Sequence, residues 1–341
     1  MRITVNDIAK LANVSQSTVS KVLNGYPNVK ESTKQEVMKT IKELNFTPDA
    51  VARSMITKKT NTLGLIVGDI SNPYFAETAK IIIEKAQSKG YNVIISNTNH
   101  DDQNLEKAIE TLLSKRVDGL LITSVSSHNQ EHIQNLCKGK IPTLLFINYI
   151  EGENVNYVVL DNKKGAQIAV EYLINIGHRN IAFISGPFKY SAISQRYFGY
   201  KSALALHDIP VRNGNIYNGE LVYENVYHFV DNLLSTDDRP TAIFASSDNI
   251  ALTILDVAAN KGMDIPKDLS VIGFDNMDIS SNQYISLTTV SHHKERLATL
   301  ALEKLLLLIE KGDLIKKPIQ LIIEPELIIR KTSSELLVQN N

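Results

Sequence analysis

The polar side chains best suited to binding chemistry follow short apolar runs, at the positions where buried strands would end. They are Asp69, Asn72, Tyr74, Phe75, Ser124, Asn148, Asp161, Ser247 and Asp275, with Arg196 in a helical pattern behind the run 181–186. Carboxylates, amides and an arginine fork hydrogen-bond hydroxyl groups, and aromatic rings stack on sugar faces. Each residue alone could instead cap a helix or face solvent. Together they predict a site for a small polar molecule.

A parallel α/β fold would gather these side chains at one edge. Eight runs rich in Val, Ile and Leu alternate with helical patterns in the body of the chain. The runs are 63–70, 91–98, 119–123, 143–148, 157–161, 181–186, 242–247 and 269–275, and clear helical patterns are 75–89, 103–115, 165–176 and 194–206. This alternation predicts doubly wound parallel sheets, which bind ligands beyond the carboxyl ends of their strands. The length exceeds one hydrophobic core, so we expect two similar halves that divide near Asp161.

The first sixty residues indicate a separate, all-helical head. Residues 4–23 hold two short helical patterns, capped by Thr4 and Ser15. They meet at Asn13, a residue type that tolerates the left-handed conformation of a sharp turn. A third pattern at 32–44 closes a three-helix core. The expected core residues are Val5, Ile8, Ala9, Leu11, Val19, Val22, Leu23, Val37, Met38, Ile41 and Leu44. This is the spacing of a helix-turn-helix.

The second helix of this head exposes side chains that suit DNA. Its outer face carries Gln16, Ser17, Ser20 and Lys21. Glutamine and lysine hydrogen-bond base edges, and serine suits phosphates or bases. Residues 1–60 hold ten lysines and arginines against five acids, a charge of +5, so the net charge of -1 leaves -6 on the remaining residues. A basic head on an acidic body indicates a polyanionic partner for the head. The alternative is a helical hairpin with a polar face.

Several other classes of protein fit the chain less well. Cys137 is the single cysteine, which suits a reducing cytosol, and neither a signal peptide nor a run of about 18 apolar residues is present. We therefore expect a cytoplasmic protein without a membrane span, rather than a solute-binding transport protein. Glycine-rich phosphate-binding motifs are absent, and His128 with His132 departs from the usual zinc motif. We therefore expect a protein that is not an enzyme and that has neither a cofactor nor a metal site.

The head and the body together resemble the lactose-repressor family. The resemblance rests on Thr4, Asp7, Ala9, Val14, Ser15, Thr18, Val19, Ser20, Val22, Leu23, Asn24, Phe46, Thr47, Pro48, Ala52, Arg53 and Ser54, and in the body on Asp69, Asn72, Phe75, Asp161, Asn162, Arg196, Gly273 and Asp275. It implies that Gln16, Ser17 and Lys21 read bases, whereas Ser15, Thr18 and Asn24 contact phosphates. Thr4, Ser20, Ala52 and Arg53 belong to the same implied DNA interface. Residues 48–56 would form a hinge helix, with Met55 as an apolar wedge in the minor groove.

The same resemblance implies a domain plan and a mechanism. The plan is a helix-turn-helix domain at 1–47, a hinge and linker at 48–61, and an effector-binding and dimerisation domain at 62–341. Its first half spans about 62–160 with a return segment at about 291–322, and its second half spans about 161–290 with the C-terminal segment. A homodimer, or alternatively a tetramer, would hold a near-palindromic operator, and a sugar or sugar derivative would close the cleft. Release of DNA by the sugar is the default, and the same architecture is compatible with a ligand that promotes binding. The chain would regulate genes of carbohydrate metabolism, most simply as a repressor, and a phosphoprotein corepressor is compatible with this plan.

Four residues depart from the family pattern. Lys21 stands in place of the commoner arginine and loses bidentate recognition of guanine. Met55 replaces a leucine, Ser247 an asparagine and Tyr149 an arginine. These departures indicate an operator and a ligand that differ from those most common in the family.

Overall fold

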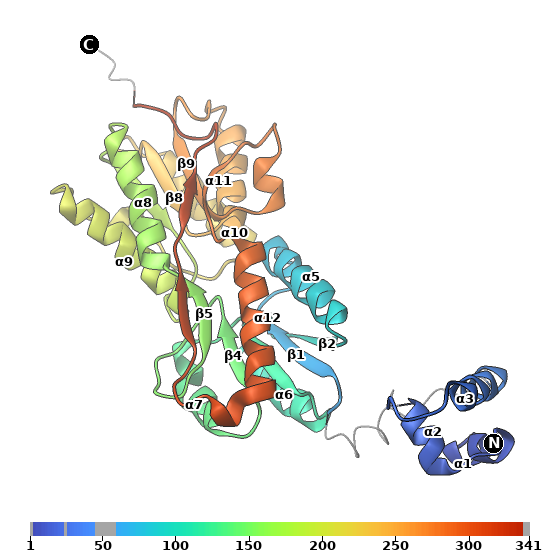
Figure 1. Cartoon of the computed structure of the whole chain (residues 1–341). Coiled ribbons are helices and arrows are strands. Elements are labelled where there is room, and N and C mark those ends of the chain that lie inside the picture. Colours follow the sequence, from blue (N-terminus) through green and yellow to red (C-terminus); the bar gives the residue numbers. More distant parts are fainter. Residues whose placement is uncertain (1–2, 24–25, 45–58, 337–341) are drawn as a thin grey trace. The chain divides into compact units, whose positions relative to one another are not determined.

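The computed structural model describes residues 3–23, 26–44 and 59–336 (Figure 1). The chain divides into two compact units, Met1–Thr60 and Asn61–Asn341, which are described separately below. No helix in the described ranges is both long and apolar enough to cross a membrane.

The head is built from α1 (Val5–Leu11), α2 (Gln16–Leu23) and α3 (Glu31–Glu43). Thr4 and Asp7 form a reciprocal cap on α1, in which the Thr4 backbone N–H donates to Asp7 Oδ2 at 2.9 Å. Asn13 adopts a φ of 52° in the turn before α2, as its residue type predicted. Ile8, Val19 and Val37 are fully buried at the centre. The predicted helix-turn-helix is thus confirmed.

Two residues expected in the core of the head lie at its surface. Leu11 is 63% exposed and Met38 is 50% exposed. On α3, the buried positions are Val37 and Thr40, one helical turn apart, which places Met38 off the inner face. Thr40 tolerates burial because its hydroxyl donates to the Glu36 carbonyl at 3.0 Å. The expectation that Met38 is buried was therefore wrong, because the neighbouring Val37 occupies the inner face of α3 instead.

The first sheet of the body has six strands among the described residues, all parallel. Its order is β11 (Gln320–Ile323), β5 (Tyr157–Leu160), β4 (Thr143–Phe146), β3 (Gly119–Ile122), β1 (Thr62–Val67) and β2 (Asn92–Asn97). The helices of this half are α5 (Pro73–Ser88), α6 (Asp102–Ser114), α7 (Gln130–Lys138) and α12 (Lys294–Lys311), with a short turn of 3-10 helix at Ser127–Asn129 and another at Gly312–Leu314. Near-continuous apolar strands covered on both faces explain the parallel arrangement.

The second sheet also has six strands in the described part of the chain. Its order is β12 (Glu326–Ile328), β10 (Thr288–Ser291), β9 (Ser270–Asp275), β8 (Ala242–Ala245), β6 (Ile181–Ile184) and β7 (Ile216–Tyr217), with β12 antiparallel to β10. Its helices are α8 (Asn162–Asn175), α9 (Ser191–Leu206), α10 (Tyr223–Leu234) and α11 (Asp248–Asn260), with 3-10 turns at Asn213–Asn215 and Asp278–Ser281. The predicted architecture of two doubly wound parallel sheets is therefore confirmed.

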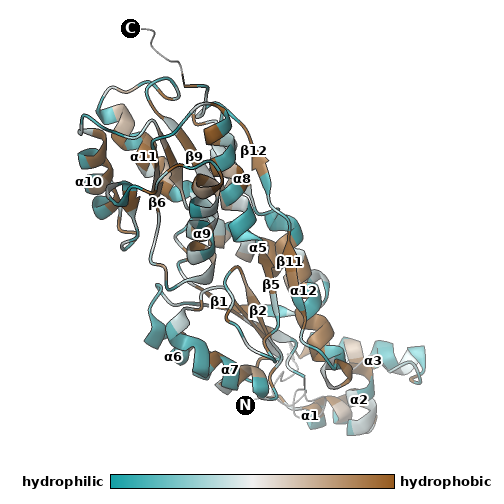
Figure 2. Ribbon diagram, turned by 90° about the vertical axis from the view of Figure 1, so that its left-hand side faces the viewer, coloured by the Kyte–Doolittle hydropathy of each residue, from teal (hydrophilic) through white to brown (hydrophobic). Residues whose placement is uncertain are grey.

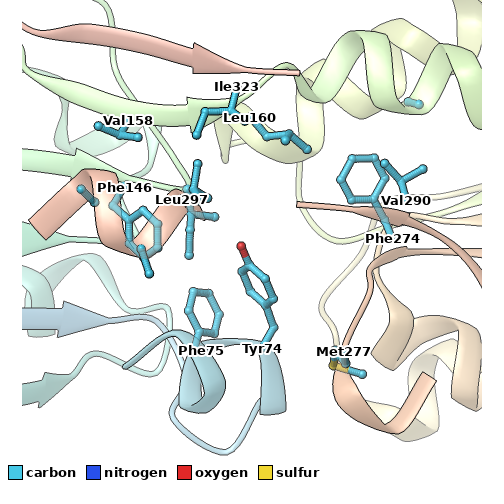
Figure 3. Packing of buried hydrophobic residues seen from close by; sticks show 14 of the residues in the cluster. Tyr74, Phe75, Phe146, Val158, Leu160, Phe274, Met277, Val290, Leu297 and Ile323 are labelled. Atoms are coloured by element: carbon cyan, nitrogen blue, oxygen red, sulfur yellow. The ribbon is translucent and has the colours of Figure 1, made fainter. Parts of the chain in front are cut away.

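The chain passes between the halves three times. It leaves β5 for α8, leaves β10 for α12, and runs from β11 directly into β12. Figure 2 shows apolar strands within layers of helices of mixed polarity, with β11 and β12 forming one continuous connection. One hydrophobic cluster extends through both halves, from Tyr74 and Phe146 to Phe274 and Val290 (Figure 3). The two halves therefore share a core at their junction.

Gly199 permits the close crossing of α8 and α9. A Cβ atom at this position would lie 2.1 Å from the backbone oxygen of Lys163. Because a backbone oxygen cannot move aside cheaply, we expect Gly199→Ala to lower the free energy of unfolding by about 1 to 3 kcal/mol. Urea unfolding of the full chain measures this loss. Gly214→Ala is the control, since its Cβ would meet nothing within 4 Å; equal losses in both variants would contradict the role of close packing.

Candidate functional site

A cavity of about 420 Å³ lies between the two halves, within the size range of small-molecule sites. Its walls come from the start of α5, from segments that follow β2, β4, β6, β7, β8 and β10, from the end of β9, and from α9. The residues that line it are Asn72, Tyr74, Phe75, Asn99, His100, Ile147, Asn148, Gly186, Pro187, Lys189, Tyr190, Ala192, Ile193, Arg196, Glu220, Leu221, Val222, Ser247, Asp275 and His292. The cavity thus lies where parallel strands end, as ligand sites in such sheets do.

Most of the side chains that the sequence grouped together meet in this cavity. Those in its lining are Asn72, Tyr74, Phe75, Asn148, Arg196, Ser247 and Asp275. The other three act locally. Asp69 accepts hydrogen bonds from the backbone and hydroxyl of Ser71, and Ser124 lies 3.2 Å from His100 Nδ1. Asp161 caps α8 by accepting from the Lys164 N–H at 2.9 Å.

A buried ion pair forms the floor of the cavity. The Arg196 and Asp275 side chains are only 4% and 7% exposed, and Arg196 Nη1 lies 3.5 Å from Asp275 Oδ1. The guanidinium also stacks on Phe274, with 3.7 Å between its carbon and the ring centre. Burial raises the pKa of Asp275 and lowers that of Arg196, and the attraction between the two opposes both shifts. The floor therefore offers a ligand both hydrogen-bond donors and acceptors.

Asp275 occupies an unusual backbone conformation. Its φ is 120°, a region that side chains other than glycine rarely adopt. The flanking Asn276 also has a positive φ, of 51°. Strained backbone of this kind tends to occur at binding and catalytic sites, where the surrounding structure fixes it. This backbone conformation places the Asp275 carboxylate in the cavity lining, at the end of β9.

Contacts beside the cavity join the two halves. The Tyr190 hydroxyl donates to the His100 carbonyl at 3.1 Å, and Lys189 Nζ lies 3.3 Å from Asp102 Oδ2. The rings of Phe75, His100 and Tyr190 form a row, with centroid distances of 6.0 Å and 5.5 Å. Tyr190 and Lys189 belong to the second half, whereas His100 and Asp102 belong to the first. These contacts hold the two halves against each other on either side of the cleft.

Reasoning from the sequence missed several polar and aromatic residues of the lining, among them His100, Lys189, Tyr190 and His292. His100, Lys189 and Tyr190 lie a few residues beyond the ends of β2 and β6, so a search that continued past each strand end would have found them. His292 lies two residues before α12, which begins at Lys294, and it is 2% exposed beside Arg196. No local pattern distinguishes a buried histidine from an exposed one at a strand end.

The head presents the side chains that were predicted to meet DNA. Gln16, Ser17 and Lys21 are exposed on α2. Ser15 caps this helix by accepting from the Thr18 N–H at 3.1 Å, and its hydroxyl lies 2.8 Å from those of both Ser17 and Thr18. Thr4 is exposed and Ser20 is half-buried. The remaining predicted contacts, Asn24, Ala52, Arg53 and Met55, lie outside the described residues.

Two segments match known protein families. Residues 4–49 match bacterial regulatory proteins of the lacI family, and residues 60–324 match periplasmic binding proteins and the sugar binding domain of the LacI family. The chain belongs to the LacI family. Among the curated relatives of this LacI-family protein is catabolite control protein A of Priestia megaterium. The two are 40% identical over 294 residues, which cover 85% of this chain and 87% of the relative.

Solved structures of the LacI family share this architecture. The Lac repressor dimer bound to operator and the anti-inducer ONPF superposes with a TM-score of 0.87, at 24% identity over 98% of this chain and all of that one. A LacI-type regulator from Alkaliphilus metalliredigens, complexed with D-xylulofuranose, is 30% identical, with a TM-score of 0.68 over 80% of this chain and 99% of that one. The fold of both units is therefore that of a LacI-family regulator.

Proposed function

We propose that this LacI-family protein is a transcriptional repressor that binds a near-palindromic operator as a homodimer and responds to a small sugar. The observation that carries the proposal is the closed cavity between the halves, in a chain that also carries a basic helix-turn-helix head. Family membership supports the DNA-binding role, and the acceptor and donor groups at Arg196 and Asp275 suit hydroxyls. This function requires no catalytic step, and we place it in the cytoplasm, where the operator is.

The charges that line the cavity favour a neutral effector. Lys189 and Arg196 supply two positive charges, and Glu220 and Asp275 can supply two negative charges. Lys189 is further engaged by Asp102. A sugar phosphate or sugar acid would bring a charge for which no unpaired cationic partner is available among the lining residues. The hydroxyls of a neutral sugar can hydrogen-bond the Asp275 carboxylate, while its apolar face can rest on Phe75 or Tyr190.

Cleft closure provides the link to DNA. An effector that makes contacts to both halves binds the closed form more tightly than the open one, so it shifts the population toward closure. In the proposed mechanism this shift changes the spacing of the two hinge segments of a dimer. The segment 48–56, which the family resemblance identifies as the hinge helix, lies outside the described residues. A phosphoprotein corepressor remains a second proposed partner, to be tested by adding it to the same DNA-binding assay.

The full-length protein can test this function directly. Selection from random duplex DNA should recover a two-fold symmetric sequence, and thermal-shift assays should rank D-xylulose and other neutral sugars above sugar acids and phosphates. The sugar that binds should then lower the affinity for the selected DNA. If no symmetric sequence is enriched over random duplex, the proposed operator binding is wrong. If only phosphorylated sugars bind, the neutral effector is wrong.

Lys21→Ala should separate specific from nonspecific DNA binding. Because Lys21 is exposed on the outer face of α2, we expect it to contact a base edge, and its loss should weaken binding to the selected operator by about 1 to 3 kcal/mol. Binding to random duplex should change much less. Fluorescence anisotropy at fixed salt measures both affinities. Lys39→Ala, at an exposed lysine of α3 that lies 3.9 Å from Glu43, is the control. Equal losses on both DNAs would show that Lys21 contacts only phosphate.

A further inference from the structure

The guanidinium of Arg196 is held by acceptors from three separate segments. Its Nε donates to Asn162 Oδ1 at 2.9 Å, its Nη1 donates to the Ser246 carbonyl, and its Nη2 lies 2.9 Å from His292 Nε2. These acceptors come from α8, from the segment after β8 and from the segment after β10. His292 is the one side chain among them that can change its charge near neutral pH.

The contact with Arg196 determines where His292 carries its proton. Arginine has only donors, so His292 Nε2 must be an unprotonated acceptor and the ring proton must lie on Nδ1. Nδ1 is 3.5 Å from Asp275 Oδ1 and has no hydrogen-bond partner among the described residues. The ring packs against Tyr74 and Phe274, with centroid distances of 4.7 Å and 5.1 Å. His292 is therefore fixed as a neutral imidazole in a tight aromatic slot.

The groups around His292 bear on its charge from several elements. Arg196 on α9 and the adjacent His293 disfavour a second positive charge, and burial acts in the same direction, so the pKa of His292 is lowered well below its ordinary value. Asp275 at the end of β9 faces Nδ1, and Tyr74 on α5 covers the ring. The more distant carboxyls Asp248 and Glu77 act on Asp275.

We propose that His292 is a positioning residue of the cavity, which as a neutral acceptor holds Arg196 in the orientation that faces the effector together with Asp275. This assignment deepens the proposed function and rests on it for the identity of the cavity as the effector site. Protonation of His292 would remove the acceptor and place two cations in contact. The bond from Nη2 would break, Arg196 would turn, and effector affinity would fall as the pH becomes acidic.

Two measurements on the full-length protein need no sugar. With ¹⁵N-labelled histidine, the resonances lost in His292→Gln identify this ring, and we expect the uncharged Nδ1–H tautomer to persist below the pH at which an ordinary histidine becomes charged. With ¹⁵N-labelled arginine, exchange of the Arg196 Nε–H with water should speed up by about tenfold in His292→Leu, which lacks the acceptor, and by less than about twofold in His292→Gln, which retains one. The control His178→Gln alters another buried histidine, which contacts Thr241 and Ser270, and should leave this exchange unchanged.

An Nε2–H tautomer, a charged ring at neutral pH, or equal exchange in the glutamine and leucine variants would overturn the proposal. A third measurement connects it to binding. Affinity for D-xylulose, measured by calorimetry at decreasing pH, should show no effect of His292 while the ring is neutral. Below the ordinary titration range of histidine, it should fall more in the wild type than in His292→Gln. The difference between these two curves isolates His292, because the carboxyls titrate in both. If D-xylulose does not bind the wild type, the chosen effector class has failed, and the tautomer and exchange results still decide the role of His292.

Discussion

Replacing Arg196 by alanine should abolish the response to sugar and leave operator affinity nearly unchanged. The guanidinium lies in the cavity between the halves, whereas the DNA-binding side chains belong to the separate head unit. The change should also lower the free energy of unfolding by about 3 to 5 kcal/mol, because it leaves the buried Asp275 carboxyl without its partner. Calorimetric titration with sugar, DNA-binding anisotropy and urea unfolding measure the three quantities. If the DNA response to sugar survives, this cavity is not the effector site.

A paired substitution separates the loss of stability from the loss of binding. Combining Arg196→Met with Asp275→Leu removes both charges and fills their space with apolar atoms. Such replacements are often neutral or stabilising, but Arg196→Met also leaves the acceptors on Asn162, Ser246 and His292 without their donor, so only part of the lost stability should return. The sugar response should remain absent, because neither the donors nor the acceptors are restored. If the paired variant regained the response, the ion pair would be structural only.

Asp248→Asn should flatten the pH dependence of stability between about pH 4 and pH 6. Asp248 is fully buried, and it accepts hydrogen bonds from the Met277 N–H at 2.9 Å, the Ser280 hydroxyl at 2.6 Å and the Thr289 hydroxyl at 2.5 Å. Burial raises its pKa from 3.8 to about 6, although these bonds oppose the shift. Because the folded pKa is raised, this carboxyl contributes stability below its unfolded pKa and loses it as the pH rises through about 6.

The sign of this effect makes the variant informative. The asparagine variant should be less stable than the wild type, since it cannot accept all three hydrogen bonds. Its deficit should shrink by about 3 kcal/mol between pH 4 and pH 7, as the wild-type carboxyl becomes charged. Urea unfolding across this range measures the deficit. Asp237→Asn, at an exposed position, is the control. A deficit that grows with pH would mean that the ionised carboxylate is the favoured form.

Much of the architecture follows from apolar runs. All eight predicted runs became strands, and seven of them match a sheet buried on both faces, whereas the edge strand β2 is largely exposed in the single chain. The short strands β7, β10, β11 and β12 were not predicted. Ile216–Tyr217 is too short to show a pattern, and Thr288–Ser291 is mostly polar, so these strands depend on neighbours that are distant in the sequence. The edge strands β7, β11 and β12, and β10 between β9 and β12, are set by the sheet and not by their own composition.

Apart from Arg196 on α9, the candidate site was predictable only where it coincides with strand ends. Asn148 and Asp275 lie directly after β4 and at the end of β9, so the topology alone brings them together. His292 could not be placed, because its burial depends on Tyr74 and Arg196 from two other elements. Ser124 also lies near a strand end, but it is not part of the cavity lining, and its hydroxyl contacts His100 instead. Contacts between distant parts of the chain determine where such residues lie, and local sequence patterns do not reveal these contacts.

The connection between β11 and β12 restricts how the halves can move. Gln320–Ile323 is paired to one sheet and Glu326–Ile328 to the other, so only Glu324 and Pro325 join them. A link of this length can twist but gives almost no slack for sliding. The other two crossings are its direct neighbours, since Leu160 pairs with Ile323 and Ser291 with Glu326. Three adjacent connections leave one easy motion, a rotation of one half against the other about an axis through the connections. A molecule bound in the cavity therefore changes the angle between the two halves.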